Sequence, residues 1–330
     1  MARINLIGWR NQAGLSRDLA LLQDVLTGAG HEVRVNGLTP PRRLKRLWLR
    51  LRSGGPPWDL AIFVEKVVPS WMELARHNVL IPNPEWLEET PGLRRVDAVW
   101  TKTRFASEAL GNLGLPLREI GFSTLDRGHL APERDGTRQW HCALHVAGRN
   151  RTKGTAPILD IWRRHPEWPS LTVVAAWSEP QSRPADLPPN IQLVDHFLDD
   201  TRLAALQRQC GLHLCPSEVE GFGHTLVEGM SVGAVVLTTD AAPMSEIVAP
   251  TRGFLVPAQS LEPMRRGHRA RVEPALLEEA VAQVLGLPES RLQEIGREGR
   301  DWFEANDRAF RQRLVSAVEA LLLPDARASH

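Results

Sequence analysis

The chain has few cysteines, almost no net charge and no long apolar run. Without an apolar run of about 18 residues, the sequence predicts no membrane-spanning helix. The three cysteines, Cys142, Cys210 and Cys215, lie in apolar segments, which favours buried free thiols in a reducing compartment over disulfides. No clustered spacing of cysteine and histidine indicates zinc. The first residues, M-A-R-I-N-L-I-G-W, lack the layout of a signal peptide, so we expect a cytoplasmic location.

Length and composition indicate a globular protein with two domains. The 330 residues are enough for two hydrophobic cores, and 42% apolar with 24% charged residues is an ordinary balance. A net charge of +1 gives no overall attraction to polyanions. The polar stretch 126–138, which contains Pro132 and Gly136, is the expected linker.

Short apolar runs alternate with segments of helical spacing along the chain. The expected strands are 3–9, 31–36, 59–65, 79–82, 97–101, 117–122, 142–146, 171–176, 191–194, 211–215 and 234–238. The expected helices are 16–29, 41–52, 70–77, 104–113, 157–164, 199–209, 276–285, 289–303 and 306–323. Such alternation predicts an α/β fold with mostly parallel sheets that are covered by helices.

The most informative segment runs from Pro216 to Val236 and reads P-S-E-V-E-G-F-G-H-T-L-V-E-G-M-S-V-G-A-V-V. It places Glu220 and Glu228 eight residues apart around a glycine turn that opens a helix. The unpaired N–H groups and the positive dipole end of a helix start suit a phosphate. Ionised carboxylates accept hydrogen bonds from sugar hydroxyls. Together these features predict a site for a nucleotide-sugar.

A second segment, V-A-G-R-N-R-T-K-G from Val146 to Gly154, carries Arg149 and Lys153. Taken alone, it is typical of a solvated basic turn after a strand. Taken with the acidic segment, its cations suit a diphosphate leaving group, because the negative charge of that group grows as the glycosidic bond breaks.

Both segments resemble motifs of retaining GT-B glycosyltransferases, in particular family 4. The acidic segment is similar to the pattern E-G-F-G, four variable residues, E-A-M-A-x-G-x-P-V-V, with Gly229 where alanine is usual and Ala234 where proline is usual. The basic segment is similar to G-R-x-x-x-K-G. A weaker similarity covers residues 251–256. The resemblance extends from about Leu144 to Val256.

The resemblance implies a GT-B fold, in which two Rossmann-like domains face each other across a cleft. Residues 1–137 would form the acceptor-side domain and residues 138–305 the nucleotide-sugar-binding domain. Residues 306–330 would form a helix that crosses back to the first domain. A retaining transfer from a UDP- or GDP-sugar is implied, with no bound metal and no permanently bound cofactor.

The resemblance also assigns the catalytic and donor-binding residues. Arg149 and Lys153 would clamp the diphosphate, Glu220 would bind the transferred sugar, and Glu228 would bind the ribose of the nucleotide. The other donor-binding candidates lie in glycine-rich turns, at the start of the helix or in a loop with a ring for base stacking. They are Gly14, Gly148, His196, Phe197, Leu198, Gly221, Phe222, Gly223, His224 and Thr225.

Polar residues in the first half follow the ends of predicted strands. They are Glu65, Asn83, Glu85 and Lys102. Ligands of open α/β sheets bind at the carboxyl ends of the strands, so these residues are the acceptor-side candidates. Each of them alone is more typical of a loop cap or a surface ion pair.

The segment from Pro40 to Arg52, P-P-R-R-L-K-R-L-W-L-R-L-R, combines an apolar stripe with cations and contains no acid. Its cations are Arg42, Arg43, Lys45, Arg46, Arg50 and Arg52. Three interpretations compete: a solvated basic face over a packed stripe, a helix on an anionic membrane surface, and a patch that follows nucleic-acid phosphates.

The segments P-N-P-E-W and D-A-V-W-T-K-T loosely resemble phage-type transferases that modify hydroxymethylated DNA bases. A 5-hydroxymethylated pyrimidine in DNA is therefore an expected acceptor, in the host cytoplasm if the chain is phage-encoded. A membrane lipid or a cell-surface glycan precursor is the alternative acceptor. A phosphorylase or hydrolase with the same sugar-phosphate site and an inactive nucleotide-sugar-binding module are the alternatives of other classes.

Overall fold

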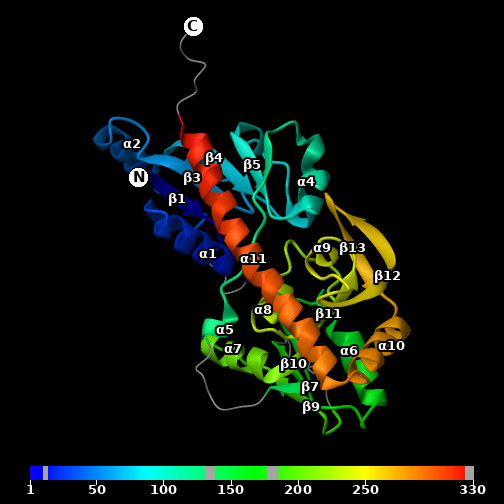
Figure 1. Cartoon of the computed structure of the whole chain (residues 1–330). Helices are drawn as coiled ribbons and strands as arrows, with labels where there is room; N and C mark the ends of the chain where they lie inside the picture. Colours follow the sequence, from blue (N-terminus) through cyan, green and yellow to red (C-terminus); the bar gives the residue numbers. More distant parts are fainter. Residues whose placement is uncertain (10–13, 131–137, 177–183, 185, 324–330) are drawn as a thin grey trace. The chain divides into compact units, whose positions relative to one another are not determined.

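The computed structural model describes residues 1–9, 14–130, 138–176, 184 and 186–323. The chain divides into two compact units (Figure 1). Unit 1 comprises Met1–Thr124, Arg265–Gly267 and Asn306–His330, and unit 2 comprises Leu125–Met264 and His268–Ala305.

Unit 1 holds a six-stranded sheet in the order β2-β1-β3-β4-β5-β6, and its strands pair in parallel. The strands are β1 (Arg3–Ile7), β2 (Glu32–Asn36), β3 (Trp58–Val64), β4 (Ala75–Ile81), β5 (Ala98–Thr101) and β6 (Leu117–Glu119). Five consecutive residues of β3 are buried, as expected for a parallel strand that is covered on both faces.

Helices and short 3-10 turns connect the strands of unit 1. They are α1 (Gly14–Gly28), α2 (Arg43–Arg52), α3 (Pro69–Met72), α4 (Arg104–Leu110), η1 (Pro84–Trp86), η2 (Leu93–Arg95) and η3 (Gly111–Leu113). Thr103 caps α4, because its side chain accepts a hydrogen bond from the N–H of Ala106.

The last helix, α11 (Glu289–Leu322), is continuous, whereas the sequence analysis predicted separate helices over 289–303 and 306–323. That prediction of a break was wrong. The intervening residues contain neither proline nor glycine, so no intrinsic signal ends the helix there. Within unit 1, Phe310 of α11 packs against Phe122 with ring centroids 5.0 Å apart, and Asn306 Nδ2 donates to the Phe122 carbonyl at 2.8 Å.

Unit 2 holds a seven-stranded sheet in the order β13-β12-β11-β10-β7-β8-β9. Its strands are β7 (Gln139–Gly148), β8 (Leu171–Ala175), β9 (Ile191–Val194), β10 (Cys210–Cys215), β11 (Val235–Asp240), β12 (Gly253–Met264) and β13 (Gly267–Val272). β10 lies between β7 and β11 and pairs in parallel with both. The carboxyl ends of β7 and β10 therefore lie at the same edge of the sheet. Neither β12 nor β13 was predicted.

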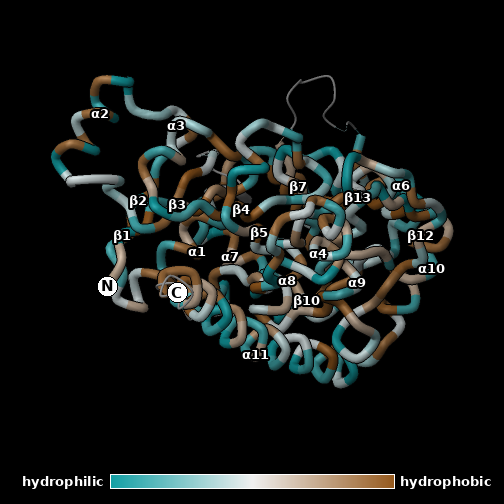
Figure 2. Tube along the Cα trace, turned by 90° about the horizontal axis from the view of Figure 1, so that it is seen from above, coloured by the Kyte–Doolittle hydropathy of each residue, from teal (hydrophilic) through white to brown (hydrophobic). Residues whose placement is uncertain are grey.

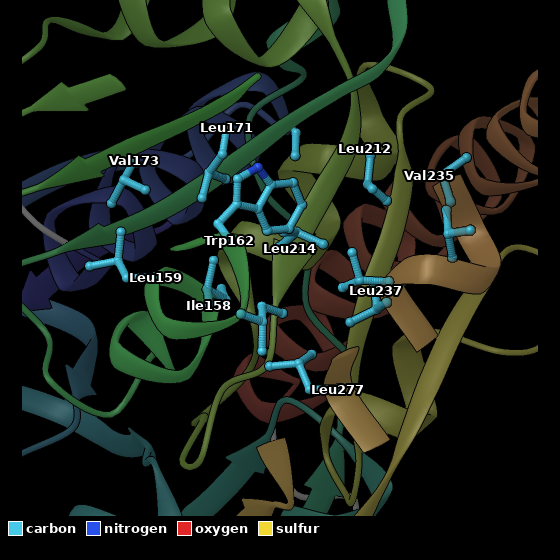
Figure 3. Packing of buried hydrophobic residues seen from close by; sticks show 14 of the residues in the cluster. Ile158, Leu159, Trp162, Leu171, Val173, Leu212, Leu214, Val235, Leu237 and Leu277 are labelled. Atoms are coloured by element: carbon cyan, nitrogen blue, oxygen red, sulfur yellow. The ribbon is translucent and has the colours of Figure 1, made fainter. Parts of the chain in front are cut away.

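Helices cover this sheet and complete its hydrophobic core. They are α5 (Arg127–Leu130), α6 (Thr155–Arg164), α7 (Asp200–Gln209), α8 (His224–Ser231), α9 (Met244–Ile247) and α10 (Pro274–Leu285). Figure 3 shows Trp162 and Ile158 of α6 among leucines of the strands, and all of these side chains are fully buried. The Trp162 indole donates to the Pro169 carbonyl at 3.0 Å, so its polar group is satisfied in the core.

The three cysteines are free and buried, as predicted. No helix in the described part of the chain combines the length and the hydrophobicity needed to cross a bilayer. The expected linker begins with a helix instead of a solvated coil, since α5 occupies 127–130.

Two histidines are buried on neighbouring strands of unit 2. His145 Nδ1 lies 2.7 Å from the Leu214 carbonyl oxygen, and His213 Nε2 lies 3.0 Å from the Gln207 carbonyl oxygen. Burial lowers the pKa of each imidazole to about 4. The unfolded chain takes up protons at both residues near an ordinary pKa of about 6.5. The free energy of unfolding should therefore fall as the pH drops from about 6.5 to about 4.

We expect His145→Gln to reduce this pH dependence, because glutamine does not titrate. The measurement is urea denaturation at about pH 7 and about pH 5, which gives the change in unfolding free energy between them. His129→Gln is the matched control, because the His129 side chain is 82% exposed. An unchanged pH dependence in His145→Gln would contradict the assignment.

Candidate donor site

Two loops meet at the carboxyl edge of the sheet in unit 2. The first, 149–154, follows β7 and is called the basic loop; the second, 216–223, follows β10 and is called the acidic loop. The N–H of Glu218 donates to the Thr152 carbonyl at 2.7 Å. Gly154 has a φ of 76°, and a Cβ there would collide with the carbonyl oxygen of Pro216. Glycine therefore allows both the left-handed backbone and the close approach of the two loops.

An ion pair connects the two loops. Lys153 Nζ donates to Glu220 Oε1, and the two side chains are only 13% and 8% exposed. A pair that is mostly withdrawn from water is weakly screened by salt. The structure thus brings together two of the three residues that the sequence analysis assigned to catalysis. Their roles toward a ligand stay predictions.

The third residue, Arg149, follows Gly148 at the end of β7 and is exposed. Among the described residues it has no ion-pair partner, which leaves its guanidinium available to an anion. Gly148 has a φ of 57°, so it turns the chain from the strand into the basic loop.

The acidic loop ends at the first turn of α8. Gly223 precedes the helix with a φ of 110°, and no side chain caps this end. The N–H groups of Leu226 and Val227 both bond to the Gly223 carbonyl, so the first turn of α8 begins directly after this glycine. Phe222 is buried and meets the His224 ring edge-on at 5.4 Å. An open helix start of this kind suits a phosphate.

Glu228 lies one helical turn further on and is fully buried. Its Oε1 accepts from Arg127 at 3.1 Å, and its Oε2 accepts from Gln207 Nε2 at 2.9 Å. Arg127 also bonds to Asp200 at 2.7 Å. Burial would lower the pKa of Arg127, but the Glu228 charge and the contacts with Asp200 raise it above its ordinary value. Ribose binding by Glu228 stays a prediction, and the structure adds a network that fixes its carboxylate.

Arg127 was missed because it lies in the polar stretch that was expected to be a linker. No local pattern distinguishes a buried arginine from its solvated neighbours. A second missed residue, Arg269 on β13, donates to Glu218 of the acidic loop at 2.5 Å. Arg269 was missed because no strand was predicted over residues 267–272.

The proposed base-pocket residues, His196–Leu198, follow β9 at the same edge of the sheet. β9 is separated from β7 by β8, and Phe197 is 74% exposed. Leu198 packs against a small core cluster that includes Cys142 and Leu144. Base stacking on Phe197 stays a prediction.

Replacing Arg127 by leucine should leave the Glu228 carboxylate buried without its cation. Removing one partner of a buried ion pair lowers the free energy of unfolding by about 3–5 kcal/mol, because the other charge stays buried and unpaired. We expect Arg127→Leu to show a loss of this order in urea denaturation. The double variant Arg127→Leu with Glu228→Gln should recover part of it. If the double variant lost as much stability as Arg127→Leu and Glu228→Gln together, the two residues would not interact in this way.

Unit 1 contains a second polar network, which we call the lysine network, at the carboxyl ends of its strands. Lys102 follows β5, and its ammonium lies 2.6 Å from Asp18 Oδ2 and 3.0 Å from Asn83 Oδ1. Lys102 and Asp18 are both buried. The structure therefore brings together two acceptor-side candidates, Lys102 and Asn83. It also adds Asp18, which was not predicted because it lies within the helical pattern of α1.

Glu65 ends this network at the edge of a cavity. Asn83 accepts from Lys102 through Oδ1, and its amide group donates to Glu65. Burial raises the pKa of Glu65, while the Lys102 charge and the Asn83 hydrogen bond offset part of that rise. Glu65 also has a φ of 71°, an unfavourable backbone for a residue with a Cβ. Such strain occurs at functional positions more often than elsewhere.

The cavity has a volume of about 280 Å³ and is lined by Glu65, Lys66, Trp9 and Trp86 among others. Its mixed carboxylate and aromatic lining suits a polar ligand with an apolar part. Glu85 is buried in η1 and is not part of this lining. Gly14 begins α1, whereas the turn before it, 10–13, lies outside the described residues.

Residues 181–267 match the family model described as glycosyl transferases group 1. No curated protein sequence matches the chain significantly. The match covers β9, β10, the acidic loop, α8, β11 and β12, but neither the basic loop nor most of β13. Together with the fold, it shows that the chain is a glycosyltransferase.

Solved structures are similar to the chain over nearly its whole length. A glycosyltransferase from Rickettsia africae ESF-5 has a TM-score of 0.74 at 13% identity, over 98% of this chain and 99% of that chain. A sucrose-phosphate synthase from Thermosynechococcus elongatus has a TM-score of 0.71 at 15% identity, over 97% and 99%. Anabaena Alr3699/HepE in complex with UDP has a TM-score of 0.71 at 13% identity, over 97% and 100%. These similarities confirm the GT-B fold of two Rossmann-like domains.

Proposed function

We propose that the chain is a retaining, family 4-like transferase that moves a sugar from a nucleotide-sugar to a hydroxyl acceptor. The observation that carries this proposal is the Lys153–Glu220 pair beside the uncapped start of α8. It places a cation for a diphosphate and a carboxylate for sugar hydroxyls at one helix terminus. UDP is the proposed nucleotide, because the similar Anabaena protein was solved with UDP and with UDP-glucose.

In this proposal the diphosphate binds at the first turn of α8 and draws Lys153 from Glu220. Lys153 and Arg149 then stabilise the charge that develops on the departing diphosphate. Glu220, released from Lys153, accepts hydrogen bonds from the transferred sugar. The acceptor hydroxyl attacks from the leaving-group side, and a phosphate oxygen takes its proton, which retains the anomeric configuration.

Glu65 would orient the acceptor hydroxyl in unit 1. Its carboxylate lines the cavity and is held by Asn83, which is itself fixed by Lys102. Because an ionised carboxylate is the better acceptor of a hydroxyl hydrogen bond, binding should favour the deprotonated form.

The acceptor proposed from sequence was a 5-hydroxymethylated pyrimidine in DNA, with a lipid or glycan precursor as the alternative. The DNA acceptor stays a prediction. One observation favours the lipid: the apolar stripe of α2 is exposed instead of packed. The three free cysteines support a cytoplasmic location for either reaction.

The first test is a panel of UDP- and GDP-sugars that is scored by thermal stabilisation of the protein. Acceptors, with hydroxymethylated DNA and lipid extracts as separate arms, are then analysed by mass spectrometry for an added sugar. Stabilisation by a nucleotide-sugar followed by transfer supports the proposal. Binding without transfer to any acceptor would favour the inactive binding module.

Lys153→Ala should lower kcat more than it weakens donor affinity, because leaving-group charge is largest in the transition state. We expect a loss in kcat of roughly a hundredfold or more. Arg297→Ala, which removes an exposed cation of unit 2 outside both loops, is the control for loss of a positive charge. A wild-type kcat in Lys153→Ala would refute the assignment.

Glu65→Gln should lower kcat/KM for the acceptor and leave donor affinity unchanged. In the wild type, kcat/KM should rise with pH through the raised pKa of Glu65, because only the carboxylate form orients the acceptor. The variant should lose this acidic limb of the pH profile. If the limb persists in Glu65→Gln, another group is responsible for it.

A further inference from the structure

α2 carries an apolar stripe that no other residue in the described ranges of the chain covers. No residue of this helix is buried, and its four stripe residues are 82%, 55%, 52% and 72% exposed. They are, in chain order, Leu44, Leu47, Trp48 and Leu51. Positions i, i+3, i+4 and i+7 lie on one face of a helix, so the four side chains form a continuous surface.

The opposite face attaches α2 to unit 1. Leu49 packs against the core of unit 1, and Arg46 Nε lies 3.7 Å from Glu73 Oε2. At about 100° per residue, these two positions point away from the apolar stripe. Figure 2 shows α2 as a segment that projects from the rest of unit 1 and carries both hydrophobic and hydrophilic residues along its tube.

Cations lie on both sides of the stripe. On the helical projection, Arg43 and Arg50 fall on one side, and Lys45 and Arg52 fall on the other. The helix contains no acidic residue, and Arg52 lies over the Trp48 ring at 5.2 Å. The contact keeps that cation beside the apolar surface.

We propose that α2 binds to the surface of an anionic phospholipid membrane. The apolar stripe would enter the boundary between headgroups and acyl chains, and the flanking cations would meet lipid phosphates. A nucleic-acid surface needs the cations but gains nothing from three exposed leucines. The complementarity of charge and hydrophobicity therefore selects a membrane over DNA. This inference concerns docking alone and does not depend on the proposed donor chemistry.

The test is sedimentation of the full chain with vesicles of phosphatidylcholine alone and of phosphatidylcholine mixed with phosphatidylglycerol. We expect binding to the mixed vesicles only, and weaker binding as the salt concentration rises. Leu44→Ser with Leu51→Ser should reduce partitioning roughly tenfold or more, because two apolar side chains no longer insert. Arg43→Glu with Arg50→Glu should reduce it as well.

Matched controls separate the role of α2 from a general loss of surface hydrophobicity or charge. Leu130→Ser with Leu261→Ser removes two other exposed leucines, and Arg118→Glu with Arg297→Glu reverses two other exposed arginines. Both should bind vesicles like the wild type. All variants should keep the thermal stabilisation by a nucleotide-sugar, so a failure of vesicle binding is distinguishable from a failure of the proposed function.

Three results would overturn the proposal. The first is absence of binding to the anionic vesicles, or undiminished binding by Leu44→Ser with Leu51→Ser. The second is binding of duplex DNA that the arginine variant loses and the leucine variant keeps, since this would make α2 a nucleic-acid surface. The third is a dimer in solution that the leucine variant dissociates, since the stripe would then be covered by a second copy.

Discussion

The Lys153–Glu220 ion pair is the interaction on which the account of the donor site depends. It joins side chains 67 positions apart, from loops that follow β7 and β10. The parallel pairing of these strands places both loops at one sheet edge, and Gly154 lets them touch. The pair keeps a cation and a carboxylate side by side with little exposure to water. In the proposed function, an incoming diphosphate would replace the carboxylate as the partner of Lys153.

Two further buried networks set the chemistry of the neighbouring residues. Arg127 and Gln207 occupy both oxygens of Glu228, so α8 is fixed at the residue expected to meet the ribose. In unit 1, Asp18 pairs with Lys102. Asn83 accepts a hydrogen bond from Lys102 and donates one to Glu65, which holds the Glu65 carboxylate in place. In both cases a buried charge is tolerated because its partner is also buried and hydrogen-bonded.

The sequence predicted the fold class, the parallel strands and the proximity of the basic and acidic loops, because these follow from local periodicity and from motifs with glycine at constrained turns. It did not predict Arg127 or Asp18, whose partners lie 101 and 84 positions away. Long-range pairing leaves no trace in local patterning. It also left the stripe of α2 open to three interpretations, because helical spacing shows that residues share a face but not whether that face is covered.

The most direct test compares the affinities of UDP and UDP-glucose for the wild type and for Glu220→Gln by calorimetry. If Glu220 binds the sugar and otherwise restrains Lys153, the variant should lose affinity for UDP-glucose and keep or gain affinity for UDP. The preference for the sugar-carrying ligand should therefore fall. An equal change for both ligands, or no change for either, would contradict the central claim.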